Sequence, residues 1–270
     1  MDHPRLEELL DEAAAQPFSG WDFSWLGDRL ITEGPGWDFE AIVERSARSS
    51  PDLLDMGTGG GEWLARLPHR PPRTVATEGW PPNVPLARRR LAPVGIEVFD
   101  AGGGPDNVDQ PFKTTVPDRG PPGALPFDDA SFHLITNRHE SWVAAEIRRV
   151  LAPGGHFVTQ QVGGGFTNDF RVALGLADTS APRPCWDLAL ATRQLDAAGL
   201  GILDSGEGVE RHTFADAAAL AWYLLAVPWT VEGFTIPAYR TQLHRLQERI
   251  DRGQPLVMRM PMFWLVATAT

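Results

Sequence analysis

Cysteine and lysine are nearly absent from this sequence. Its 270 residues include a single cysteine, Cys185, and Lys113 is the only lysine among 24 basic residues. A lone cysteine allows neither an internal disulfide nor a cysteine-based zinc site, and we expect no metal. Long apolar runs are also missing. The longest, Ala217–Trp229, is shorter than the ~20 residues of a membrane-spanning helix and contains Pro228.

Positive charge is scarce as well. The chain has 24 basic and 35 acidic residues, a net charge of −11. An acidic protein repels phosphate backbones, which disfavours nucleic acid as a partner. The densest basic run, Arg88–Arg90, falls on a predicted helix, where successive side chains point in different directions, so we expect it to be solvated. The N-terminus, Met1–Gln16, is acidic and lacks an apolar signal core, which predicts a cytoplasmic protein.

Short apolar runs alternate with helical segments in the middle of the chain. The predicted strands are Leu53–Met56, Arg73–Thr77, Ile96–Phe99, Phe132–Thr136 and Phe157–Val162, and the predicted helices between them are Glu62–Leu67, Pro82–Leu91 and Trp142–Leu151. This alternation predicts an α/β protein with a doubly wound, parallel sheet that is covered by helices on both faces.

The flanking segments are mainly helical. Pro4–Ala15 is predicted as an amphipathic helix, Gly20–Trp37 as a connector, and Thr213 as the N-cap of a helix over Ala215–Val227. Further predicted elements are a helix ending near Arg48, helices over Trp186–Ala198 and Tyr239–Arg252, and a closing strand over Met262–Thr268. We therefore expect an N-terminal helical cap over residues 1–50 and one α/β domain over 51–270, with a helical insertion at about 210–255.

Glycines follow the first strand at a regular spacing, Asp55-x-Gly57-x-Gly59-x-Gly61. A buried strand that delivers an acidic residue, a glycine loop and then a helix start is how open α/β sheets bind nucleotides. A dinucleotide fingerprint would require a glycine where Glu62 stands, so the spacing argues against that ligand.

Three further segments accompany this loop in order. Glu78 ends the second strand, Ala124–Ile135 reads ALPFDDASFHLI, and Ala145–Val162 reads AEIRRVLAPGGHFVTQQV. Together with the loop they resemble the class I S-adenosylmethionine (SAM)-dependent methyltransferases of the type 11-like group. The resemblance covers about Leu53–Val162, and the tail, with Thr213-Phe214 and Ala226–Trp229, resembles a bacterial branch. It implies a Rossmann-like, mostly parallel seven-stranded sheet with an antiparallel last strand, SAM as cofactor and S-adenosylhomocysteine as product.

The resemblance also implies a set of cofactor contacts. In this sequence they are Asp55, Gly57, Thr58, Gly59, Gly61, Glu78, Gly79, Trp80, Asp100 and Asn137. Asp55 would fix the loop and the cofactor's ammonium, and Glu78 would accept both ribose hydroxyls, since a carboxylate has sites for both. Trp80 either lies against adenine or packs in the core. Asp100 is the candidate to bind the adenine amino group. Because a Gly- and Pro-rich stretch at 101–123 follows Asp100, Asp118 or a backbone group could bind it instead.

The end of the fourth strand is where the transferred methyl group is expected. His139 could remove a proton from a hydroxyl or a protonated amine, because imidazole titrates near neutral pH. Glu140 could orient His139 or bind a substrate cation. The alternative is a polar turn in which Ser141 caps the next helix. Nucleic-acid base methyltransferases carry Asn/Asp-Pro-Pro-aromatic here, and only Asn137 matches that pattern.

Tryptophan is abundant, with 10 residues. Several lie in the N-terminal and C-terminal regions from which this family commonly builds its substrate pocket: Trp21, Trp25, Trp37, Trp222 and Trp229. Aromatic side chains suit a flat or apolar molecule, although each could equally be core. The leading hypothesis is methyl transfer from SAM to a small-molecule acceptor, and a homodimer is the oligomeric state we expect. The alternatives are a SAM-binding protein that transfers no methyl group and, third, an RNA methyltransferase.

Overall fold

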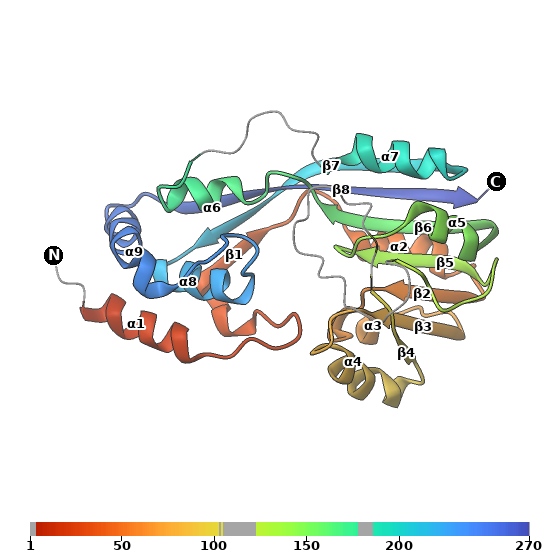
Figure 1. Ribbon diagram of the computed structural model, residues 1–270, viewed down its shortest axis with the longest axis horizontal. Helices are drawn as coiled ribbons and strands as arrows, with labels where there is room; N and C mark the ends of the chain where they lie inside the picture. The colour runs from red at the N-terminus through yellow and green to blue at the C-terminus, as the bar shows by residue number, and fades with distance from the viewer. Residues whose placement is uncertain (1–3, 103, 105–122, 178–185, 270) are drawn as a thin grey trace. The chain divides into compact units, whose positions relative to one another are not determined.

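The computed structural model describes residues 4–102, 104, 123–177 and 186–269. The strands are β1 (Leu30–Glu33), β2 (Asp52–Met56), β3 (Arg73–Glu78), β4 (Glu97–Asp100), β5 (Phe132–Arg138), β6 (Leu151–Val162), β7 (Leu200–Phe214) and β8 (Leu256–Ala269). The helices are α1 (Pro4–Ala15), α2 (Phe39–Ala47), α3 (Glu62–Arg66), α4 (Val84–Leu91), α5 (Ala144–Val150), α6 (Asn168–Ala173), α7 (Leu188–Ala197), α8 (Ala217–Ala226) and α9 (Ile236–Asp251), with short 3-10 helices at Ser24–Arg29 and Ala92–Val94. Within the described ranges, the strands form one sheet in the order β1-β7-β8-β6-β5-β2-β3-β4 (Figure 1).

The chain divides into two compact units. Unit 1 comprises Met1–Gly36, Gly164–Arg183 and Val209–Pro261, and unit 2 comprises Trp37–Gly163, Pro184–Gly208 and Met262–Thr270. Unit 2 contains every residue expected to bind the cofactor. The N-terminal helix and most of the expected helical insertion belong to unit 1. The division into a cap over 1–50 and a domain over 51–270 stays a prediction.

Parallel strands form the centre of unit 2. β2 pairs with β3 and β5, β3 pairs with β4, and β5 pairs with β6, all in parallel, whereas β8 runs antiparallel to β6. The predicted Rossmann-like α/β fold, with a mostly parallel sheet and an antiparallel last strand, is thereby confirmed. The described residues contain eight strands, one more than the seven expected.

Each face of this sheet has its own hydrophobic core. Adjacent residues of one strand belong to opposite cores, as Leu53 and Leu54 of β2 illustrate, because successive side chains of a strand alternate. One core contains Leu54, Ile135, Phe157 and residues of α5 and α7, and the other contains Leu53, Leu134, Val158 and residues of α2, α3 and α4. Burial on both faces explains why these strands read as continuous apolar runs.

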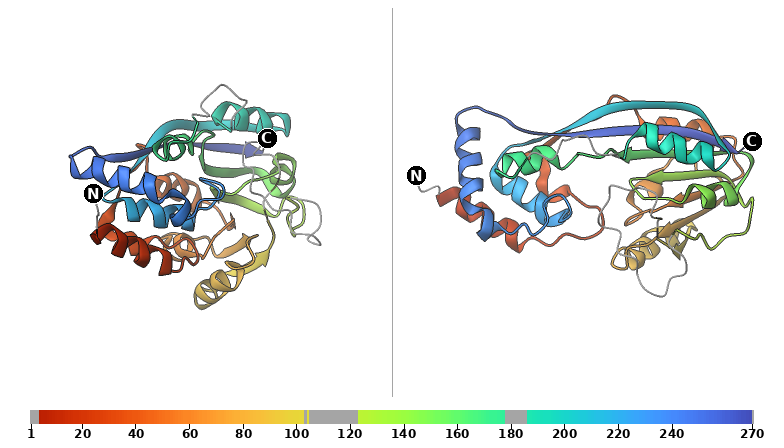
Figure 2. Two further views of the ribbon diagram at one scale, coloured as in Figure 1. Left: turned by 60° about the vertical axis from the view of Figure 1, so that its left-hand side comes forward. Right: turned by 45° about the horizontal axis from the view of Figure 1, so that its top comes forward.

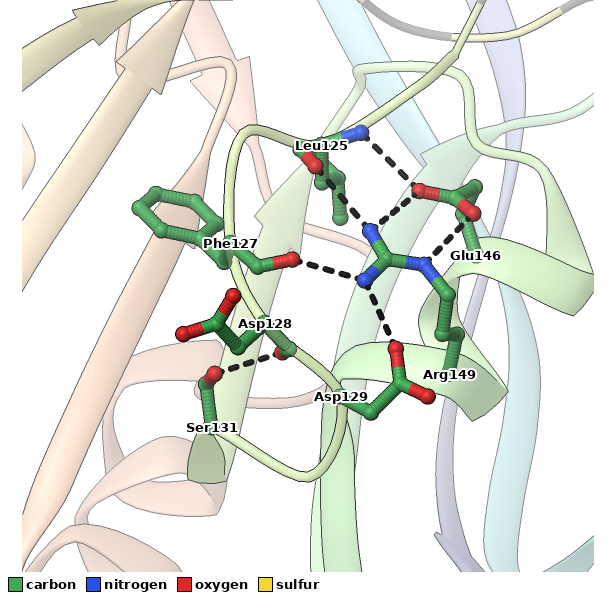
Figure 3. A network of polar contacts seen from close by, with 7 residues as sticks. All are labelled: Leu125, Phe127, Asp128, Asp129, Ser131, Glu146 and Arg149. Atoms are coloured by element: carbon green, nitrogen blue, oxygen red, sulfur yellow. Dashed lines mark hydrogen bonds and ion pairs between the residues drawn. The ribbon is translucent and has the colours of Figure 1, made fainter.

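Arg149 of α5 holds the segment that leads into β5 in place through hydrogen bonds and ion pairs (Figure 3). Its guanidinium donates to the carbonyl oxygens of Leu125 (3.0 Å) and Phe127 (2.6 Å) and to the carboxylates of Asp129 and Glu146. Glu146 also accepts from the Leu125 backbone N–H at 3.0 Å. The two sequence segments that carry much of the resemblance, Ala124–Ile135 and Ala145–Val162, are thus joined through one side chain.

Unit 1 is built around α8. Figures 1 and 2 show α1, α8 and α9 side by side, and their apolar residues form one core. Every residue of α8 except Leu225 is buried, so this helix is apolar on all sides. Among the described residues, no helix is long and apolar enough to cross a membrane.

Two expectations for unit 1 were wrong. Thr213 does not cap α8, because it lies within β7, and the cap is Asp216, whose carboxylate accepts from the Ala219 N–H at 2.8 Å. The connector Gly20–Trp37 contains a strand, β1, which pairs antiparallel with Arg211–Phe214 of β7. β1 escaped prediction because its four residues are too few to establish a period, and the pairing partner lies about 180 residues away in the sequence.

We expect Arg149→Met to lower the free energy of unfolding by about 1–3 kcal/mol, because it removes the donor for two backbone carbonyls and two carboxylates. Urea unfolding measures the loss. Arg148→Met is the matched control, since Arg148 takes no part in this network. Equal losses in the two variants would contradict the structural role of Arg149.

Candidate active site

The carboxyl ends of β3, β2 and β5 meet at one edge of the sheet, because these strands are parallel neighbours. This edge brings together the glycine loop after β2, Glu78 at the end of β3, and the turn that contains His139 and Glu140 after β5. Asp100 ends β4 one strand further out, in register with Glu78. The site residues expected from the sequence therefore lie on four adjacent strand ends.

Glycines give the loop after β2 its backbone conformation. Gly57, Gly59 and Gly61 have φ values of 66°, 64° and 80°, in the left-handed region that side-chain-bearing residues rarely adopt. The loop is held from both sides: the Thr58 N–H donates to the Thr77 carbonyl at 2.9 Å, and Arg90 donates to the Gly60 carbonyl at 2.6 Å. Its position therefore depends on β3 and α4.

The three residues of the run Arg88–Arg90 are exposed, as expected, but two of them also have partners within the chain, and the first of these is Arg90. Besides its bond to Gly60, it forms an ion pair with Glu62, the first residue of α3. Arg88 donates from Nε to the Val98 carbonyl at 3.1 Å. These partners lie elsewhere in the chain, and the spacing of the arginines gave no signal for them.

The Glu78 carboxylate connects β3 to the glycine loop. Its Oε2 accepts from the Gly59 N–H at 2.6 Å, and its Oε1 accepts from the Trp80 N–H at 2.7 Å. The side chain is buried, and burial raises the pKa of Glu78 to about 7, with the nearby charge of Glu140 adding to the rise. The carboxyl group therefore exchanges its proton in the neutral range, as functional carboxyls often do.

Asp55 lies at the base of the loop. It is buried and accepts from the Thr136 hydroxyl of β5 at 2.8 Å. Burial raises the pKa of Asp55 to about 6, although the Thr136 bond and the positive charge of Arg138 oppose the rise. The aspartate thus links β2 to β5 as Glu78 links β3 to the loop.

The turn after β5 is strained at His139. This residue has φ 61°, and its backbone N–H donates to the Gln160 carbonyl at 2.9 Å. Desolvation, helped by the charge of Arg138, lowers the pKa of His139 to about 3, so the imidazole is neutral at pH 7. Its Nδ1 is buried and has no partner among the described residues. Backbone strain at a polar turn is typical of functional sites.

Glu140 lies against the glycine loop. A Cβ on Gly57 would fall 2.4 Å from the Glu140 Cβ, so only glycine fits there. The Ser141 hydroxyl donates to Glu140 at 3.4 Å and does not cap α5, which begins at Ala144 without a side-chain cap. The alternative reading of this turn, with Ser141 as the cap, was therefore wrong.

Three carboxyl groups, those of Asp55, Glu78 and Glu140, lie at the glycine loop, and this acidic setting suits a cationic ligand. In the described part of the chain, no three His, Cys, Asp or Glu side chains are grouped so as to hold a metal ion.

Gly79 and Trp80 continue from Glu78. A Cβ on Gly79 would lie 2.3 Å from the Gly102 Cα, so the glycine permits a close approach of two backbones. The Trp80 side chain is 56% exposed, as a ring that receives a ligand would be, and Asp100 is also exposed. Asp118, the alternative to Asp100, and Cys185 lie outside the described residues.

A polar group that the sequence analysis missed supports Asn137. Gln161 of β6 donates to the Asn137 side-chain oxygen at 2.6 Å and to the Glu140 carbonyl at 3.1 Å, and Thr159 also donates to the Asn137 oxygen. A signal was available in the sequence, because glutamine is unusual at the end of a buried strand.

Comparison with known proteins agrees with this fold. Residues 54–159 match a family described as a methyltransferase domain. A proposed methyltransferase from Bacillus halodurans is 17% identical, with a TM-score of 0.54 over 86% of this chain and 99% of its own. The YcgJ protein of Bacillus subtilis is 16% identical, with a TM-score of 0.55 over 86% and 97%.

A functionally unknown protein from Deinococcus radiodurans matches almost the whole chain, with 17% identity, a TM-score of 0.51 and coverage of 99% and 100%. At such identities the likeness to solved structures shows the fold alone. No curated protein sequence matches the chain. Residues 54–159 thus match the methyltransferase domain family, and the fold of the chain is that of the class I methyltransferases.

We expect Gly57→Ala to be more destabilising than an ordinary substitution at positive φ. The left-handed backbone costs about 1–2 kcal/mol for a non-glycine residue, and the collision with Glu140 adds to this. Gly95→Ala is the matched control, because Gly95 has φ 75° and no atom of the described residues would lie within 4 Å of its added Cβ. Urea unfolding should show the larger loss in the free energy of unfolding for Gly57→Ala. Equal losses for the two variants would mean that the turn at Glu140 moves aside without an energetic cost.

The raised pKa of Glu78 predicts a pH-dependent stability. A carboxyl whose pKa rises from 4.5 to about 7 on folding stabilises the folded state below pH 4.5, and this stabilisation is lost as the pH rises through 7. The loss should be on the order of 3 kcal/mol. Urea unfolding at pH 5 and pH 8 should show it in the wild type and a flatter profile in Glu78→Gln. The exposed Glu97→Gln should keep the wild-type slope, and an unchanged slope in Glu78→Gln would contradict the assignment.

Proposed function

We propose that this protein is a SAM-dependent methyltransferase that acts on a small-molecule acceptor. The observation that carries the proposal is the set of three carboxyl groups, Asp55, Glu78 and Glu140, at a left-handed glycine loop on the carboxyl edge of a parallel sheet. SAM is a cation, and its ribose diol needs a carboxylate with free acceptor sites. The residues present fit this cofactor.

We propose the following roles for the site residues, and the geometry described above is compatible with them. Glu78 would accept the ribose hydroxyls while its bonds from Gly59 and Trp80 keep it oriented. Asp55 would hold the loop, with Gly57, Thr58, Gly59 and Gly61 presenting backbone to the methionine moiety. Trp80 would lie against adenine, with Gly79 and Asp100 beside it. When bound, SAM supplies the methyl group in an in-line displacement, for which positioning is the main requirement.

His139 and Glu140 would contact the methyl acceptor. With a pKa near 3, His139 is a weak base, so we assign it the role of a neutral hydrogen-bonding group at the acceptor. Glu140 would bind a cationic acceptor or the cofactor's ammonium. Both assignments rest on the position of the turn after β5.

The aromatic residues of unit 1 form a cluster of a kind that suits flat or apolar molecules. Trp21 stacks on Trp229, with ring centroids 6.0 Å apart and planes at 9°, and Trp21 is 47% exposed. Trp25 and Trp222 lie close together within the same cluster. Such rings offer large apolar contact at low entropic cost. The cytoplasmic location and the homodimer stay predictions.

We expect isothermal titration calorimetry to detect SAM binding to the wild type and none to Asp55→Ala or Glu78→Ala. Because a Glu78 with a pKa near 7 must lose its proton to accept both hydroxyls as a carboxylate, binding should release a proton. SAM affinity should then rise by about tenfold per pH unit below pH 7 and level off above it. Titrations in two buffers of different ionisation enthalpy measure the proton release. No SAM affinity in the wild type would overturn the proposal.

Product analysis distinguishes the remaining functions. Release of S-adenosylhomocysteine only in the presence of an acceptor indicates methyl transfer, whereas acceptor turnover with SAM unconsumed indicates a SAM-binding catalyst of another reaction. Salt-sensitive binding to RNA would favour an RNA methyltransferase.

A further inference from the structure

Three buried polar side chains form a network at the carboxyl ends of β5 and β6. Asn137, Thr159 and Gln161 each have no exposed surface. The Gln161 Nε2 donates to the Asn137 Oδ1 at 2.6 Å, to the Thr159 hydroxyl at 2.9 Å and to the Glu140 carbonyl at 3.1 Å. The Thr159 hydroxyl donates to the same Asn137 oxygen at 3.1 Å.

One backbone carbonyl fixes the orientation of both amides. The Glu140 carbonyl can only accept, so Gln161 must present its nitrogen on that side. The same nitrogen faces Asn137, which must therefore present its oxygen. Thr159 would tolerate either orientation, because a hydroxyl both donates and accepts.

The consequence is a donor that points away from the network. The Asn137 Nδ2 is buried and has no partner among the described residues. An unsatisfied buried donor destabilises a protein and calls for an explanation such as a ligand.

The strand order indicates which part of a ligand Asn137 would meet. Asn137 is in register with Met56, the residue before Gly57, and β5 lies on the opposite side of β2 from Glu78. If Glu78 takes the ribose, the amino-acid end of SAM extends toward β5. Of the groups at that end, the ammonium and the sulfonium accept no hydrogen bond, whereas the carboxylate does.

We propose that Gln161 is a positioning residue of the cofactor site: it orients Asn137 so that Nδ2 donates to the carboxylate of the cofactor's amino-acid end. This inference rests on the proposed use of SAM. Because Nδ2 is buried in the ligand-free chain, the ligand must displace the atoms that cover it. The bound carboxylate then satisfies a donor that has no partner in the described part of the chain.

The test compares three ligands. SAM and S-adenosylhomocysteine carry the amino-acid end, and 5′-methylthioadenosine lacks it. Asn137→Ala removes the amide, and Gln161→Glu replaces the donor with an acceptor, so that Asn137 turns its nitrogen inward. Each variant should weaken SAM and S-adenosylhomocysteine by about tenfold to hundredfold, as expected for a lost bond to a charged group, and leave methylthioadenosine unchanged.

The double variant and a control complete the set. Asn137→Ala with Gln161→Glu should lose no more affinity than either single variant, because both remove the same contact. Thr268→Val removes a 3.0 Å bond to the Gly155 carbonyl at the other end of β6 and should leave all three affinities unchanged. Equal losses for SAM and methylthioadenosine would reduce Gln161 to a general structural role, and no loss for SAM would overturn the proposal.

A measurement without ligand separates this inference from the proposed function. In the side-chain amide region of a 15N spectrum, Gln161→Glu should move the Asn137 protons to hydrogen-bonded positions, since they then face a carboxylate. Unmoved Asn137 resonances would show that Gln161 does not orient Asn137. A wild type that binds none of the three ligands would overturn the cofactor contact, while the spectrum still decides the orientation.

Discussion

The Glu78 carboxylate is the constraint on which the site depends. By accepting from Gly59 at 2.6 Å and from Trp80 at 2.7 Å, it ties the loop after β2 to the end of β3. These two hydrogen bonds help to keep the loop glycines in their left-handed backbone conformation, which a loop without them would adopt only part of the time. They also bury a carboxyl group beside the charge of Glu140, which raises the pKa of Glu78 to about 7. The buried position of Glu78 therefore has two consequences: it fixes the loop, and it makes the negative charge of the carboxylate unfavourable.

Other residues at the same edge of the sheet are also held in arrangements that lower the stability of the folded chain. Asp55 is buried, His139 has a left-handed backbone and a desolvated ring, and Asn137 has a donor with no partner among the described residues. Each would be relieved by an ordinary core residue or by a glycine. Such costs concentrate where a protein binds a ligand, because a site complementary to a ligand is imperfect without it. The two hydrophobic cores of unit 2 and the Arg149 network stabilise the scaffold that carries them.

Local signals in the sequence were reliable where the cause is local. The parallel strands and α1 could be predicted, because apolar periodicity depends on neighbours in the chain. Thr213 and Asp216 show the limit. Both are good capping residues, and the choice between them depends on where β7 ends, which its pairing with β1 decides. The hydrogen bond of Arg90 could not be predicted for the same reason: its partner Gly60 lies 30 residues away in the sequence, and no pattern in the arginine run indicates it.

The sequence by itself determined the class of fold, the glycine spacing and the acidic residues that end β2 and β3, because backbone freedom, strand periodicity and residue charge are properties of the chain. Only the tertiary structure decided the protonation of Glu78 and His139 and the direction of the Asn137 amide. Desolvation comes from atoms of several strands at once, and an amide's orientation follows from the carbonyl of Glu140 through Gln161 of a different strand. Such through-space effects have no counterpart in linear spacing.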